Sequence, residues 1–211
     1  MNRLPTLFFG IFITFASAWL GLILWPVLFI GHLPPHQDPD TQDILPPPSP
    51  GLALIGKRVY EKNGCMYCHT QQIRPETTGS DIARGWGSRR TVPRDYIHDK
   101  PVLLGTMRTG PDLTNIGRRW GTDAAAIAKH HLHLYAPRLV SPGSIMPPYH
   151  FLYETRKIQG SPSPDALKLE GTPYAPPPGY EVVPTAEARA LVAYLISLDR
   201  TYPLPEIPEQ P

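Results

Sequence analysis

The longest apolar stretch of the chain lies at its start, where residues 4–31 read LPTLFFGIFITFASAWLGLILWPVLFIG without one charged side chain. A helix needs about 20 apolar residues to cross the hydrocarbon core of a bilayer, so the pattern predicts a transmembrane anchor over residues 1–31. A cleaved signal peptide is one alternative, because residues 16–18 (ASA) resemble a cleavage site. The apolar run continues to Ile30, beyond the roughly 7–15 residues of a signal's apolar core, which favours the anchor. A buried helix of a soluble core is a further alternative.

Three later segments carry apolar residues at the spacing of an amphipathic helix. They are Gly51–Asn63, Asp123–Leu134 and Thr185–Leu198. Thr185 is placed to cap the last of them, and Thr122 or Asp123 to cap the second. Gly64 is a plausible end for the first. No run of alternating apolar residues is long enough to predict a sheet, so the expected fold is mainly α.

Proline is the compositional outlier, with 28 of 211 residues. The prolines crowd residues 34–50 and 162–184, which predicts extended linkers or loops rather than helix or strand. The expected organisation is an anchor (1–31), a Pro-rich tether (32–50), a folded domain (51–199) that contains a Pro-rich insertion (160–184), and a C-terminal tail (200–211).

Charge and cysteine content narrow the function. The formal net charge is only +2, which gives no reason to expect a nucleic acid or an acidic substrate.

The two cysteines, Cys65 and Cys68, stand three apart and are followed by His69. Cys-x-x-Cys-His is the attachment signature of c-type haem. Two thiols at this spacing reach the two vinyl groups of a porphyrin as thioethers, and the histidine then lies under the iron as an axial ligand. The motif therefore predicts one covalently bound haem c.

Other interpretations of the motif are weaker. A thioredoxin-like redox pair would require a βαβ pattern, which the sequence does not show. A zinc site would require two further ligands, for which His130, His131 and His133 are the candidates; residues crowded in this way on one helix are more often surface or packing residues. A structural Cys-x-x-Cys-His without a cofactor is the remaining alternative.

A single haem usually has a second axial ligand, and methionine opposite histidine is the arrangement that raises the reduction potential in electron transfer. Met107 and Met146 are the candidates that remain once Met1 and the motif's own Met66 are set aside. Met146 is followed by two prolines that stiffen its loop, and it precedes the last helix, so we favour Met146. A role for Met146 as a packing residue of the core is the alternative.

The order of helix, haem motif, Gly-Pro-Asp-Leu, Met-Pro loop and final helix resembles the class I cytochrome c domain over residues 51–198. The resemblance implies that the first and last helices cross, with Gly56 close to Leu191 or Tyr194. It also implies that the carbonyl of Pro111 accepts a hydrogen bond from the ring of His69 and orients it. The implied fold is thus a single transmembrane helix followed by a class I cytochrome c domain with long Pro-rich loops.

A closer resemblance is carried by the stretch CMYCHTQQIRP at residues 65–75. It is similar to the mono-haem subunit (CcoO or FixO) of cbb3-type cytochrome c oxidases, as are residues 108–113 (RTGPDL) and 144–147 (SIMP). That family usually has Trp-Gly-Ser-Lys before Arg-Thr-Gly-Pro-Asp-Leu, where this chain has residues 104–107 (LGTM).

The resemblance implies an electron relay from a donor cytochrome c to a membrane haem-copper catalytic subunit, alongside other cytochrome c subunits. It implies no catalysis by this chain alone. Arg74 is expected to pair with a haem propionate or with the catalytic subunit. Other propionate or docking candidates are Arg89, Arg90, Arg94, Arg118 and Arg119. For each of these arginines and for Arg74, a solvated position on the surface is the alternative, and for each of the five taken alone the solvated position is favoured.

The expected location is the inner (cytoplasmic) membrane of a bacterium, crossed once. Arg3 is the only positive charge before the apolar segment, so the positive-inside tendency keeps it in the cytoplasm and the haem domain on the periplasmic side. Three other functions remain open: a free-standing anchored electron shuttle, the cytochrome subunit of a nitric oxide reductase, and a haem-based gas sensor. Residues 73–75 (IRP) argue against the second, and the sequence shows no output domain for the third.

Overall fold

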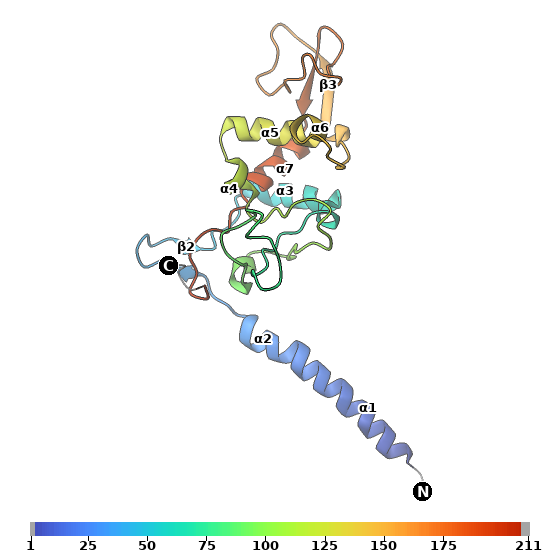
Figure 1. The fold of residues 1–211 in the computed structure, drawn as a ribbon, viewed down its shortest axis with the longest axis vertical. Coiled ribbons are helices and arrows are strands. Elements are labelled where there is room, and N and C mark those ends of the chain that lie inside the picture. Colours follow the sequence, from blue (N-terminus) through green and yellow to red (C-terminus); the bar gives the residue numbers. More distant parts are fainter. Residues whose placement is uncertain (1–2, 208–211) are drawn as a thin grey trace.

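A computed structural model describes residues 3–207 of the chain (Figure 1). Its N-terminal helix runs from Leu4 to Ile30 and projects away from the rest of the molecule, with none of its most apolar stretch buried. At about 1.5 Å per residue, its 27 residues extend for roughly 40 Å. Within the described chain this is the one helix long and apolar enough to cross a membrane. Residues 1 and 2 of the predicted anchor lie outside the described part.

The long helix contains one wider turn. It consists of α1 (Leu4–Trp19), a π-helical turn η1 (Leu20–Leu24) and α2 (Trp25–Ile30). Pro26 has no backbone N–H to donate, and its ring clashes with the carbonyl four residues earlier in a regular α-helix. A π-helical turn just before the proline relieves this conflict without ending the helix.

Two helices cross at the centre of the folded domain, namely α3 (Gly51–Lys62) and α7 (Ala186–Ile196) (Figure 1). They meet at Gly56, where a Cβ atom would lie 1.8 Å from the carbonyl oxygen of Ala190 and 2.7 Å from the Cβ of Tyr194. Only glycine permits this approach, so the predicted crossing at Gly56 is confirmed. Thr185 caps α7 as predicted, because its hydroxyl accepts a hydrogen bond from the N–H of Ala188.

The second predicted helix is also present. Helix α5 (Ala124–Tyr135) begins after Asp123, whose carboxylate accepts a hydrogen bond from the N–H of Ala126. It packs against α7 and continues into the short helix α6 (Pro137–Val140). The short helix α4 (Ile116–Trp120) also packs on α7. A long loop with two 3-10 turns, η2 (Cys65–Tyr67) and η3 (Pro93–Tyr96), connects α3 to α4.

The described chain is mostly helical as expected, but it also contains a small sheet that the sequence did not predict. Strand β3 (Tyr153–Lys157), which follows the 3-10 turn η4 (His150–Leu152), pairs antiparallel with β4 (Tyr180–Pro184). Strand β4 falls inside the Pro-rich segment that was expected to be loop. Its proline stands at the last position of the strand, where a missing N–H does the least harm to the ladder. The loop between the strands contributes Leu169, which is buried in the core.

The tether also contains ordered structure. Two short strands, β1 (His36–Gln37) and β2 (Ile44–Leu45), pair into a small hairpin. The side chain of Leu45 is buried in a small cluster with Val92 and Leu204. The tether is therefore packed on the folded domain and on the start of the C-terminal tail. Residues 208–211 of that tail lie outside the described residues.

Candidate functional site

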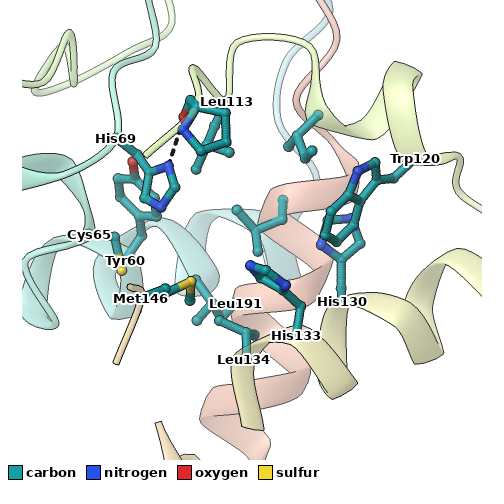
Figure 2. Close-up of a pocket in the computed structure, with 13 residues that line it drawn as sticks. Tyr60, Cys65, His69, Leu113, Trp120, His130, His133, Leu134, Met146 and Leu191 are labelled. Atoms are coloured by element: carbon teal, nitrogen blue, oxygen red, sulfur yellow. Dashed lines mark hydrogen bonds between the residues drawn. The ribbon is translucent and has the colours of Figure 1, made fainter. Parts of the chain in front are cut away.

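A cavity lies between the loop that follows α3 and the helices α5 and α7 (Figure 2). About 550 Å³ of space there, including the open solvent at its mouth, is not filled by protein atoms. Its walls are mainly apolar. They are formed by Tyr60, Cys65, His69, Pro111, Leu113, Ile116, Trp120, His130, His133, Leu134, Met146, Leu191 and Leu195.

The cysteine motif lies directly after α3. Gly64 ends the helix in a left-handed conformation (φ 67°), which glycine adopts without steric cost. The next residues form a tight turn, in which the N–H groups of Cys68 and His69 both donate to the carbonyl of Cys65. This turn places Cys65 on the cavity wall and leaves Cys68 exposed.

His69 is held in one orientation. Its ring Nδ1 donates a hydrogen bond to the carbonyl oxygen of Pro111 over 2.7 Å (Figure 2). The other ring nitrogen, Nε2, is then the one with a free lone pair. Burial lowers the pKa of His69, which keeps the imidazole neutral, as a metal ligand must be. The contact predicted between His69 and Pro111 is therefore present.

The space for this ring depends on Gly110, which was not predicted as a residue of the site. A Cβ atom at Gly110 would lie 2.3 Å from Cε1 of His69, so any side chain there would displace the imidazole. The N–H of Gly110 also donates to the carbonyl of Cys68. The Gly-Pro-Asp-Leu segment is the sequence feature that could have indicated Gly110, because its glycine directly precedes Pro111, whose carbonyl holds His69.

A buried carboxylate ties the motif to that segment. Asp112 is fully buried and accepts hydrogen bonds from the hydroxyl of Thr70 and the N–H of Gln72. It also accepts one from the N–H of Thr114. A carboxylate with this many donors is well satisfied. Asp112 therefore fixes the residues after His69 against the loop that carries Pro111.

Met146 enters the cavity from a different part of the chain, the loop between α6 and η4 (Figure 2). The N–H of Met146 donates to the hydroxyl of Ser144, and the N–H of Tyr149 donates to the carbonyl of Leu134. These contacts anchor the loop on both sides of the methionine. Met107, the other candidate, is 56% exposed and does not line the cavity.

The structure does not bring Arg74 to the cavity. Its guanidinium pairs with the buried carboxylate of Asp81, with 3.0 Å between Nη2 and Oδ1. Arg108 approaches the same carboxylate at 2.7 Å. Burial opposes ionisation of Asp81, but hydrogen bonds from Arg74 hold its pKa below the usual value. None of the other arginines proposed for the site lines the cavity in the described chain either. They are Arg89, Arg90, Arg94, Arg118 and Arg119.

Two histidines and a tryptophan on the cavity wall were not predicted as residues of the haem site. His130 and His133 were interpreted as surface or packing residues, yet both line the cavity together with Trp120. Their spacing of three residues places them on the same face of α5. That spacing was the only available signal, because the sequence does not show which face of the helix meets the cavity.

The donor set fits a haem better than zinc. Among residues 3–207, no three His, Cys, Asp or Glu side chains gather as a metal ion would require. Burial raises the pKa of the Cys65 thiol to about 11. An apolar cavity with one thiol, one oriented imidazole and one thioether on its wall is instead suited to a flat apolar cofactor that carries iron.

Comparison with known families agrees with this geometry. A family model described as cytochrome c oxidase, mono-haem subunit/FixO, matches residues 6–176, which include most of the long apolar helix, the cysteine motif and Met146. No curated protein sequence shows significant similarity to the chain. The match covers most of the 211 residues, and the helix that it includes is apolar and long enough for a membrane anchor. The chain belongs to the FixO family, the mono-haem electron-transfer subunits of cytochrome c oxidase.

Proposed function

We propose that the chain binds one haem c covalently through Cys65 and Cys68, with His69 and Met146 as the axial ligands of its iron. The domain that holds it would be of the class I cytochrome c type. The observation that carries this proposal is the meeting of Cys65, His69 and Met146 on one apolar cavity, although two different loops supply them. The crossing of α3 and α7 at Gly56 supports the proposed domain type.

The residues around the site have distinct tasks. The carbonyl of Pro111 holds the ring of His69 so that Nε2 remains available to iron. The loop with two prolines after Met146 limits the freedom of the thioether. The apolar walls, including Leu113, Leu191 and Leu195, exclude water and lower the local dielectric. The cofactor, when bound, supplies the one-electron redox couple.

We further propose that the chain transfers electrons and catalyses no reaction alone. With His69 and Met146 both committed to iron, no coordination position is left for a substrate. A histidine–methionine ligand pair also raises the reduction potential, as suits a carrier near the oxidising end of a respiratory chain.

The proposed place of the chain is a cbb3-type oxidase in the inner membrane of a bacterium. There it would accept electrons from a donor cytochrome c and pass them to the haem-copper catalytic subunit, alongside other cytochrome c subunits. The family match supports an oxidase complex, and Arg3 before the long apolar helix supports a periplasmic haem domain.

The packing of the tether bears on the alternative of a free-standing shuttle. The guanidinium of Arg94 donates a hydrogen bond to the carbonyl of Pro34, and Leu45 is buried against the domain. A tether packed in this way restricts the swinging that a mobile shuttle would use. This restricted tether supports the proposal of a fixed oxidase subunit over that of a mobile shuttle.

Purification of the full-length chain from its native membranes in mild detergent tests this assignment. We expect an affinity-tagged chain to co-purify with haem b and copper in a constant ratio to its own haem c, because the oxidase would remain assembled. An untagged strain, processed identically, is the control for background binding. A chain that elutes alone with haem c would support the free-standing shuttle and contradict the oxidase assignment. Partner subunits with haem b but no copper would indicate a nitric oxide reductase instead.

A further inference from the structure

His130 and His133 leave two buried ring nitrogens without a partner. The side chain of His130 is buried, and its Nε2 atom has no hydrogen-bond partner among the described residues. The Nδ1 atom of His133 is also buried and unpaired within the described chain. Both rings lie against Trp120, with ring centres 4.6 Å apart for His130 and 5.4 Å apart for His133. A buried polar atom without a partner is unfavourable, so this pair requires an explanation.

Both imidazoles are suited to donate hydrogen bonds as neutral groups. Burial lowers the pKa values of His130 and His133 to about 4, so the rings are uncharged at neutral pH. A neutral imidazole carries one N–H donor. The titratable and charged groups that face the pair are Lys129 and His131 on the same helix and His69.

Along the cavity, His130 lies farther from Cys65 than His133 does. Figure 2 shows Cys65 at one end of the cavity, with His130 and Trp120 at the other and His133 between them. The porphyrin of haem carries its vinyl groups toward one edge and its two propionate carboxylates toward the other. If Cys65 and Cys68 hold the vinyl edge, the carboxylates extend away from them. The unpaired nitrogen of His130 therefore lies on the side of the cavity that would receive the carboxylates, and His133 lies between that side and Cys65.

We propose that His130 and His133 hold the propionate carboxylates of the haem by donating hydrogen bonds from their buried ring nitrogens. This proposal rests on the proposed function, because it requires the haem to be attached at Cys65 and Cys68. It also assigns the propionates to residues other than Arg74. Arg74 is paired with Asp81 and does not line the cavity. Trp120 keeps both imidazoles in place by packing against them, and Lys129 lies over the Trp120 ring at 4.2 Å.

The test compares His130→Phe and His133→Phe with a matched control, His131→Phe, in the full-length protein with its haem. His131 is buried on the same helix, but it does not line the cavity and its ring lies 3.1 Å from the hydroxyl of Tyr153. The readouts are redox-difference infrared spectra, which distinguish ionised from protonated propionates, and the reduction potential measured against pH.

We expect a carboxylic acid band at neutral pH in His130→Phe and His133→Phe, because a buried carboxylate that loses its donors takes up a proton. In these variants the equilibrium constant for haem reduction should then change by up to about tenfold per pH unit. This corresponds to a change in the one-electron reduction potential of roughly 59 mV per pH unit. His130→Gln and His133→Gln, which keep an N–H donor, should restore ionised propionates. His131→Phe should resemble the parent in both readouts.

Infrared spectra and pH profiles unchanged from the parent in both Phe variants would overturn the proposal. So would loss of the iron's axial bond in His133→Phe, because His133 would then be an iron ligand. If a Phe variant fails to retain haem, the Gln variant at the same position tests the proposal instead. Protonated propionates in that Gln variant would contradict the proposal, because the variant keeps an N–H donor. A parent protein without covalently bound haem would instead refute the proposed function, so the two failures are distinguishable.

Discussion

Replacing Met146 with alanine should open one face of the haem iron. We expect the reduced Met146→Ala protein to bind about one carbon monoxide per haem, whereas the parent, with both axial positions filled, should bind little. The reduction potential should fall by at least about 60 mV, a tenfold change in a one-electron equilibrium, because a thioether ligand favours the reduced iron. Carbon monoxide difference spectra and a redox titration measure the two effects.

Met107 provides the matched control for this experiment. It is the other methionine that the sequence offers as an axial ligand, but it is exposed and does not line the cavity. Met107→Ala should therefore keep the parental potential and remain unreactive toward carbon monoxide. The reverse result, in which Met107→Ala binds carbon monoxide and Met146→Ala does not, would assign the thioether ligand to Met107.

Replacing Gly56 with leucine should severely destabilise the folded domain. The new Cβ atom alone would lie 1.8 Å from the carbonyl oxygen of Ala190, and that backbone atom can move only if α3 and α7 separate. Overpacking of a core costs about 1–3 kcal/mol and sometimes more. For a clash with backbone we expect a loss of about 3 kcal/mol or more in the free energy of unfolding, a large part of a domain's total stability. Denaturant titration of the haem-containing protein in detergent measures it.

Gly51→Ala is the control for a change of glycine in the same helix. A Cβ atom at Gly51 would meet nothing within 4 Å, so its effect on the free energy of unfolding should stay within about 1 kcal/mol. Equal stability of Gly56→Leu and Gly51→Ala would mean that the two helices do not cross closely at Gly56.

The helices of the domain could be predicted from the sequence because the signals for them are local. Apolar spacing identified α3, α5 and α7, and the capping residues Thr185 and Asp123 perform the roles expected of them. The long apolar helix was equally clear, since a run of this length without charge has few alternatives.

The strands could not be predicted because their pairing depends on distant residues. Strand β3 has polar side chains that are mostly exposed, so it lacks an alternating apolar pattern. Its partner β4 lies beyond a long Pro-rich loop and ends in Pro184. Each strand is stabilised by pairing with the other, and the sequence of neither segment alone indicates that pairing.

Some residues of the candidate site could be predicted from local sequence signals, and others could not because their positions depend on the tertiary structure. The spacing of Cys65, Cys68 and His69 is a local signal with a specific chemical meaning, and the resemblance to known cytochromes indicated Pro111. Which side of α5 meets the cavity is a tertiary property, so the position of His130 and His133 could not be predicted from their spacing. The pairing of Arg74 with Asp81 likewise depends on how the loop after the motif folds back on itself.

The central claim is that one haem is attached covalently at the cysteine motif. The most direct test is the intact mass of the purified mature polypeptide, followed by mass spectrometry of the peptide that contains Cys65 and Cys68. The account predicts a polypeptide heavier by one haem, with the added mass on that peptide. A mature polypeptide with two free thiols and no added porphyrin mass would contradict it.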